Sequence, residues 1–159
     1  MSTTPQDFSL PKMEENILSF WEEHDVFQQS ISQSAHQQPY IFYDGPPFAT
    51  GLPHHGHLLA STIKDIIPRY QTMNGKYIIR RFGWDCHGLP IEHEINKSLK
   101  MSAHDAVNKL GIDGYNRECR NIVMRYSKEW RKTITRLGRW VDFDFDYKTM
   151  DDPFMESVW

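Results

Sequence analysis

Three histidines around one glycine are the densest group of side chains in this sequence that could do chemistry. They form the run His54-His55-Gly56-His57, which follows an apolar segment and a Gly/Pro-rich loop. On the first turn of a helix, His54 and His57 would share one face because they are three positions apart. The free N–H groups and the dipole of such a turn favour an anion such as a polyphosphate. Histidines there can donate hydrogen bonds to phosphoryl oxygens as charge develops, and Gly56 lets a ligand approach the backbone closely.

The same histidines admit two other interpretations. A metal site would use His54 and His57 as ligands, together with His87 further along the chain. No carboxylate or thiolate lies at a regular metal-ligand spacing from them, which argues against that site. Surface loop histidines are the ordinary explanation for one such residue. Three of them around a glycine, directly after a predicted strand, favour the phosphate interpretation.

A second loop, residues 82–90, carries a carboxylate between a predicted strand and a helix that Pro90 would start. Asp85 could hold the ammonium group of a ligand by a charge-assisted hydrogen bond, or it could cap the helix. Trp84 could line an apolar pocket, with core packing as an equal alternative. Cys86 is not expected to be a nucleophile, because nothing in its surroundings marks an activated thiolate.

A third group is the turn Asp44-Gly45-Pro46-Pro47. Its two prolines stiffen the backbone, so the turn can present fixed carbonyl groups near Gly45 and Pro46 to the amino group of a ligand. The alternative is a plain turn that ends a strand.

These loops are expected to lie at the carboxyl ends of two parallel strands. Residues 40–43 and 77–79 are short apolar runs that predict strands, and residues 57–70 have helical spacing, with Pro68 expected to kink or end the helix. Strand, helix and strand in this order predict a βαβ unit and an α/β fold with a parallel sheet. Ligands of such sheets bind at the carboxyl ends of the strands. The apolar positions expected to pack the helix on the sheet are Leu58, Leu59, Ile63, Ile66 and Ile67.

Residues 1–38 are predicted to be an amino-terminal arm, a helix and a linker, and residues 39–159 the remaining domain. Pro11 can open the first helix at its first position. Residues 28–38, rich in Ser and Gln, predict a linker or surface loop. Further on, the alternation in residues 140–147 predicts a half-buried strand. The later helices are expected to begin at Pro90, at Ala103 after an N-cap at Ser102, near residue 113 or 115, and after Asp151.

The long helix that is expected to reach about residue 137 carries the one local concentration of basic residues. A solvated face is the favoured interpretation of this pattern, and a surface that contacts phosphates is the alternative. The basic side chains lie at positions 117, 120, 125, 128, 131, 132, 136 and 139.

Composition limits the class of protein. The 159 residues are 25% charged and 39% hydrophobic, which is typical of a globular chain, and the net charge of −3 gives no global attraction for nucleic acid. No apolar run approaches the length of a membrane span, and the polar start resembles no secretory signal. Cys86 and Cys119 lie far apart and predict no disulfide framework, so we expect a reducing, cytoplasmic location.

Two long motifs resemble a known family. The stretches DGPPFATGLPHHGH and FGWDCHGLPIE are similar to the amino-terminal half of the catalytic domain of class I aminoacyl-tRNA synthetases, and within that class to the isoleucyl-tRNA synthetases. His54, Gly56 and His57 match the His-x-Gly-His signature of the class. The GWDCHGLPIE stretch distinguishes the subgroups, because valyl and methionyl enzymes usually have Gly-Thr-Asp there and leucyl enzymes Asp-Ala-Phe-Gly-Leu-Pro. The tail RLGRWVDFDFDYKTMDDPFMESVW also resembles the isoleucyl subgroup.

The resemblance implies part of a Rossmann-like parallel-sheet nucleotide-binding fold, with an amino-terminal helix and a long basic helix. It implies activation of isoleucine by ATP with Mg²⁺ and transfer to tRNA(Ile), in a cytoplasmic enzyme that we expect to be monomeric and without membrane contact. The implied catalytic residues are His54 and His57, which bind ATP together with Gly56. The implied amino-acid-binding residues are Gly45, Pro46, Trp84 and Asp85.

The chain lacks several segments that this family has. It has no Lys-Met-Ser-Lys-Ser signature, and the editing and anticodon-binding parts are missing, so we expect a catalytically deficient fragment cut from a longer protein. No metal site is expected in this segment, and any zinc would lie elsewhere in the full-length protein. The alternatives are a valyl- or leucyl-type synthetase, a small nucleotidyltransferase, and a non-catalytic fragment that binds a nucleotide or a partner.

Overall fold

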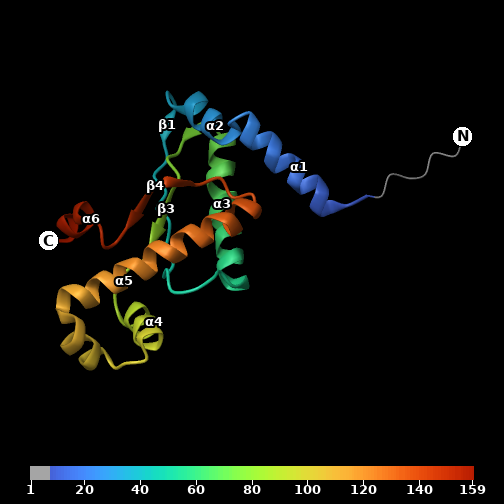
Figure 1. The fold of residues 1–159 in the computed structure, drawn as a ribbon. Helices are drawn as coiled ribbons and strands as arrows, with labels where there is room; N and C mark the ends of the chain where they lie inside the picture. The colour runs from blue at the N-terminus through green and yellow to red at the C-terminus, as the bar shows by residue number, and fades with distance from the viewer. Residues whose placement is uncertain (1–7) are drawn as a thin grey trace, which may run out of the picture.

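The computed structural model describes residues 8–159 and has six helices around two pairs of short parallel strands (Figure 1). This mixed arrangement confirms the predicted α/β fold class. In chain order the elements are α1 (Leu10–Glu23), α2 (Val26–Ser34), β1 (Gln38–Pro39), α3 (His55–Met73), β2 (Lys76–Tyr77), β3 (Arg81–Trp84), α4 (Leu89–Leu99), α5 (Ala103–Arg136), β4 (Asp142–Lys148) and α6 (Asp152–Val158).

The strand pairs are parallel because each is closed by a helical connection. β1 pairs with β2 across α3, with Gln38 opposite Lys76, which confirms the βαβ unit. β3 pairs with β4 across α4 and α5, and an isolated parallel bridge joins Phe48 to Asp85. The bridge between Phe48 and Asp85 brings the loop after β1 beside the carboxyl end of β3.

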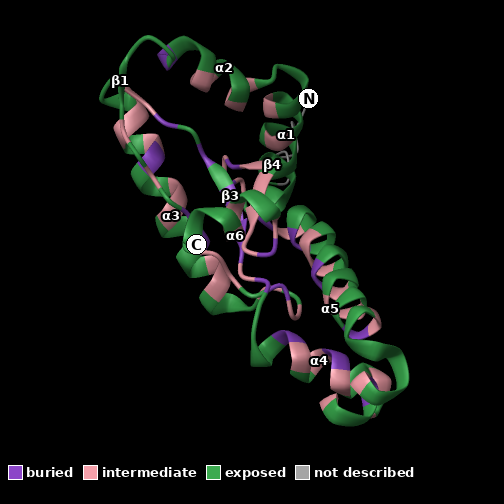
Figure 2. Cartoon of the chain, turned by 90° about the vertical axis from the view of Figure 1, so that its left-hand side faces the viewer, coloured by how far each residue is buried: buried purple, intermediate pink, exposed green. Residues whose placement is uncertain are grey.

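The core lies where α5 crosses β3 and β4. Trp84 and Phe82 of β3 pack with Trp130 and Ile134 of α5 and with Val141. A smaller cluster of Ile95, Ala106 and Tyr115 joins α4 to the start of α5. Figure 2 shows this division, with buried positions along β3 and α5 and exposed positions over most of α1 and α3.

The prediction of a core strand at residues 40–43 is wrong. The paired strand β1 ends at Pro39, and the last ladder bond runs from the Tyr40 amide to the Tyr77 carbonyl at 2.8 Å. Ile41 and Tyr43 are 77% and 84% exposed. Among the described residues no strand lies on the second side of this segment, so its apolar side chains have nothing to pack against.

The second expected strand is displaced along the chain. Only Tyr77 of residues 77–79 belongs to a strand, and β3 (Arg81–Trp84) occupies the start of the predicted loop 82–90. β3 forms there because Phe82 and Trp84 reach the aromatic core on α5, and burial of such large side chains outweighs local turn propensity.

The helix α3 differs from the prediction in two respects. It continues through Pro68 to Met73, and its apolar positions Leu59, Ile63, Ile66 and Ile67 face outward instead of packing on the sheet. The polar side of α3 faces inward because buried guanidinium groups need acceptors there. Arg139 donates to Ser61, and Arg80 donates to the Thr72 hydroxyl.

Two further predictions are corrected. Residues 28–38 are largely the helix α2 instead of a linker, because Phe27 packs against Trp140 with ring centroids 6.1 Å apart. The alternation in β4 fails at Phe145, which is 73% exposed. Between Arg81 and Gly83 the register shifts, so that β4 has three more residues than the facing part of β3, and the Asp142 carboxylate accepts two following amides there. An odd number of extra residues reverses the side on which Phe145 lies.

The remaining helix boundaries are confirmed. Pro11 and Pro90 lie in the first turns of α1 and α4, and the Ser102 hydroxyl accepts the Asp105 amide at 3.1 Å. Gly111, with φ of 72°, interrupts α5 between the predicted short and long helices. Asp151 is the N-cap of α6.

Replacing a core side chain on α5 is expected to cost much more stability than replacing an exposed one on α3. Ile134→Ala should lower the free energy of unfolding by about 2–5 kcal/mol, because a buried side chain leaves a cavity. The matched control Ile66→Ala, at a side chain 58% exposed, should change it by less than about 0.5 kcal/mol. Urea denaturation of both variants measures the difference, and equal losses would contradict this placement of the core.

Candidate nucleotide- and amino-acid-binding site

The first turn of α3 holds two histidines in a reciprocal cap. The Gly56 amide donates to Nδ1 of His54 at 3.1 Å, and the His54 amide donates to Nδ1 of His57 at 3.2 Å. The two rings stack with centroids 3.7 Å apart. The predicted shared face is therefore confirmed, although His54 is the N-cap residue and the helix begins at His55.

This cap selects the tautomer of both rings. Because each Nδ1 accepts a backbone N–H, the proton of the neutral imidazole lies on Nε2, and both Nε2–H groups remain available as donors. Desolvation lowers the pKa of His57 below its usual value of 6.5, with smaller contributions from the positive charge of His54 and of Lys64. The turn thus offers hydrogen-bond donors beside the positive end of a helix dipole, which suits phosphate oxygens.

Trp130 on α5 supports this turn, and sequence reasoning did not identify it. Its ring lies 4.8 Å from that of His57, and its indole N–H donates to the Gly51 carbonyl at 2.6 Å. It also contacts Trp84 edge to face at 5.5 Å. A tryptophan on the inward face of a long helix gives only a packing signal in sequence, so this supporting role required the tertiary structure.

The two loops predicted to bind an amino acid are brought together. The Asp85 amide donates to the Pro47 carbonyl at 2.9 Å, which places Asp85 beside the turn that contains Gly45 and Pro46. Asp85 is half-buried, and Gly88 is the N-cap of α4, so Asp85 does not cap that helix. Its carboxylate is contacted only at 3.5 Å by the His87 amide among the described residues, which leaves it free for a cation.

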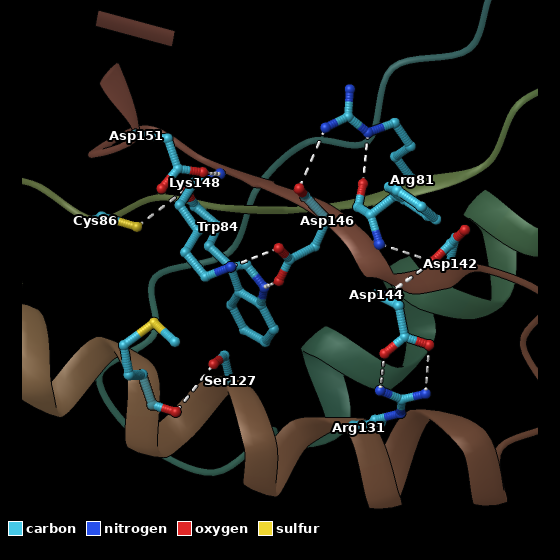
Figure 3. A network of polar contacts seen from close by, with 12 residues as sticks. Arg81, Trp84, Cys86, Ser127, Arg131, Asp142, Asp144, Asp146, Lys148 and Asp151 are labelled. Carbon is cyan, nitrogen blue, oxygen red and sulfur yellow. Dashed lines mark hydrogen bonds and ion pairs between the residues drawn. The ribbon is translucent and has the colours of Figure 1, made fainter. Parts of the chain in front are cut away.

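Trp84 lies in the core instead of on an open pocket wall. It is fully buried, and its indole N–H donates to Asp146 at 2.8 Å, beside the Lys148–Asp146 ion pair (Figure 3). Direct contact with a ligand would require the side chains that cover Trp84 to move. The role of Trp84 in binding stays a prediction.

Asp44 joins the Gly45 turn to the rest of the molecule. Its buried carboxylate lies 3.1 Å from the Arg139 guanidinium and 2.7 Å from the Lys64 ammonium. Its carbonyl accepts the Tyr147 hydroxyl at 2.6 Å. Lys64 also donates to the Gly45 carbonyl at 2.6 Å. Sequence reasoning named Asp44 only as part of the turn and Arg139 only among the basic positions, and it missed Lys64. The local signal of each is a charge within a turn or a helix.

Other candidate chemistry receives less support. Within residues 8–159 no group of three His, Cys, Asp or Glu side chains could hold a metal ion, which includes the alternative site at His54, His57 and His87. Burial raises the pKa of the Cys86 thiol, in agreement with the expectation that it is no nucleophile. None of the helices described in this structure has the length and apolar character that crossing a membrane demands.

Three of the basic residues of α5 form ion pairs within the chain. Arg131 binds Asp144 through both guanidinium nitrogens, as Figure 3 shows, and the pair raises the pKa of Arg131. Arg136 binds Glu14 on α1 at 2.9 Å, and Arg125 lies 3.4 Å from Glu129. This internal pairing supports the solvated-face interpretation over a phosphate-binding surface.

The chain matches a family model over most of its length. The model of class I tRNA synthetases of the I, L, M and V type covers residues 16–159. The chain therefore belongs to the class I tRNA synthetase family.

Two curated relatives carry the name isoleucine–tRNA ligase. The chain is 62% identical over 154 residues to the cytoplasmic isoleucine–tRNA ligase of Arabidopsis thaliana, which is 97% of this chain and 13% of that protein. The cytoplasmic isoleucine–tRNA ligase of Saccharomyces cerevisiae is 58% identical over 159 residues, which is 100% of this chain and 15% of the relative. The chain thus spans about one seventh of the length of these curated relatives.

A solved structure supports the fold. The agnB2 LeuRS of Agrobacterium radiobacter K84, in a ternary complex with tRNA and LeuAMS, superposes with a TM-score of 0.64. The match covers 89% of this chain and 16% of that one at 16% sequence identity, so it bears on the fold alone.

Acid is expected to destabilise the cap of α3. Because the pKa of His57 is lower in the folded chain, the unfolded chain binds more protons below pH 6.5, and stability should fall as the pH decreases through that value. The loss should level off once the pH lies below the folded pKa. Urea denaturation between pH 7.5 and 5 measures the slope, and NMR titration of His57 measures its pKa.

The variant His57→Gln is the control for this pH dependence. Its side-chain oxygen can still accept the His54 amide, but it does not titrate. The slope should therefore be smaller than in the unsubstituted chain. An identical slope, or a His57 pKa at or above 6.5, would contradict the cap described here.

Proposed function

We propose that this chain is the first part of the catalytic domain of an isoleucine–tRNA ligase. In the complete enzyme, isoleucine and ATP would give isoleucyl-adenylate and pyrophosphate, and the acyl group would then pass to the terminal ribose of tRNA(Ile). The observation that carries this proposal is the 58–62% identity to relatives of that name over nearly the whole chain. Residues 1–38 would be the amino-terminal extension, and residues 39–159 the first half of the catalytic domain.

The turn at the start of α3 is proposed to act on ATP. Nε2–H groups of His54 and His57 would donate to oxygens of the α-phosphate as charge develops in the in-line displacement. Gly56 has no side chain, so adenine could pack against the backbone at this point. This support comes from the free donors of the stacked, capped pair.

The neighbouring loops are proposed to hold isoleucine. The Asp85 carboxylate and the carbonyls of Gly45 and Pro46 would bind its ammonium group, since these loops are joined by the bond between Asp85 and Pro47. Trp84, which is buried, would support the wall of the amino-acid pocket from the core side. No covalent nucleophile is needed, because the site acts by positioning two substrates and stabilising charge.

The remaining parts of the proposal concern the complete enzyme. ATP would be a substrate and would bind together with Mg²⁺. Any zinc would bind outside these residues. We propose a cytoplasmic monomer, and the cytoplasmic names of the Arabidopsis and yeast relatives support the location.

A chimera tests the function directly. Residues 1–159 would replace the matching segment of the yeast relative, which aligns with the chain over all 159 residues. We expect isoleucine-dependent ATP–pyrophosphate exchange by the chimera and none by residues 1–159 alone. Faster exchange with valine or leucine would favour another subgroup, and absent exchange in the chimera would favour a non-catalytic binding fragment.

Loss of one negative charge should weaken amino-acid binding selectively. In the chimera, Asp85→Asn is expected to raise KM for isoleucine by about 10–100-fold, since a neutral amide oxygen accepts a weaker hydrogen bond from an ammonium group than a carboxylate does. KM for ATP should change by less than about twofold. The matched control is Asp152→Asn on the exposed start of α6. Similar increases in both KM values would point to a structural effect and count against the assigned role.

A further inference from the structure

One contact at the predicted amino-acid site involves a residue with no role assigned above. The Lys64 ammonium lies 2.6 Å from the Gly45 carbonyl oxygen and 2.7 Å from the Asp44 carboxylate. Lys64 is half-buried on α3, while Asp44 is buried and Gly45 exposed. The carbonyl proposed to receive a substrate ammonium is therefore already held by an ammonium of the protein.

This contact leaves room for a second donor. A carbonyl oxygen has two lone pairs, and Lys64 uses one of them. The carbonyl of Gly45 lies at an exposed position, and a side chain added there would meet only Lys64 atoms, the nearer at 3.7 Å. Apart from Lys64 the surroundings of Gly45 are open, which is compatible with a ligand at the second lone pair.

Lys64 and His57 lie on one face of the same helix. They are seven residues apart, which is two helical turns and about 10 Å along the axis. Ser61 lies between them on this face and accepts a hydrogen bond from Arg139, which in turn binds Asp44. The inward face of α3 thus connects the proposed ATP turn at one end with the Gly45 turn further along.

The charges favour a fixed geometry over a mobile one. Asp44 carries one negative charge between the ammonium of Lys64 and the guanidinium of Arg139, and the Arg139 pair is buried. Removing one partner of such a group leaves the others incompletely paired, so the contacts restrain one another.

We propose that Lys64 is a positioning residue, which holds the Gly45 carbonyl at a fixed distance from the histidine turn and so aligns isoleucine with ATP. This inference rests on the proposed function. Lys64 does not contact the reacting atoms, and it acts through the backbone of Gly45 and the carboxylate of Asp44.

Kinetics of Lys64 variants in the chimera test this role. Lys64→Met removes both contacts and should raise KM for isoleucine by about tenfold, with KM for ATP changed by less than about threefold. Lys64→Gln, which is neutral but polar, should show the same split if the Met variant does not fold. Lys64→Arg keeps the charge and should restore KM for isoleucine to within about threefold. Lys128→Met, on the exposed face of α5, is the matched control.

The outcomes separate this inference from the function on which it rests. If the unsubstituted chimera is active and the Lys64 variants keep its KM for isoleucine, the positioning role alone is overturned. A lower KM for isoleucine would also overturn it, because it would show that Lys64 competes with the substrate ammonium. A fall in thermal stability with equal changes for both substrates would show a structural role only. No exchange in the unsubstituted chimera would defeat the proposed function and this inference together.

Discussion

The buried carboxylate of Asp44 is the interaction on which the arrangement of this site depends. The carboxylate is fully enclosed and binds Arg139, which follows α5, and Lys64 on α3. The backbone carbonyl of Asp44 accepts the Tyr147 hydroxyl from β4. A buried charge is costly unless it is paired, so these elements can approach only in the arrangement that satisfies it. The turn after residue 43 is thereby fixed even though β1, the strand before it, has only the two residues Gln38–Pro39.

The candidate site combines two loops that the parallel bridge between Phe48 and Asp85 brings together. The loop after β1 ends in the capped histidines of α3, and the loop after β3 carries Asp85. Aromatic packing connects them, because Trp130 contacts both His57 and Trp84. A polyphosphate and an ammonium could therefore bind at adjacent positions, which is the geometry that a reaction between ATP and an amino acid requires.

The exposed apolar surfaces agree with the small share of the relatives that the chain spans. The outer face of α3 and the segment 41–43 expose side chains that would ordinarily be covered. A groove of about 620 Å³ lies along that segment, between Tyr43, Ile79 and Phe154. Its apolar walls are typical of a surface that adjoins further structure.

The sequence by itself determined the α/β class, the βαβ order, most helix starts and the histidine turn. Those features depend on neighbours within about four residues, as the caps at Ser102 and His54 illustrate. Only the tertiary structure decided that α3 turns its polar side inward, that β3 replaces the predicted loop, and that Trp84 is buried. These outcomes depend on contacts between distant residues, such as Arg139 with Asp44, 95 positions apart. A buried guanidinium that needs acceptors can reverse the face that local periodicity predicts, because an unpaired buried charge costs more than exposed apolar side chains.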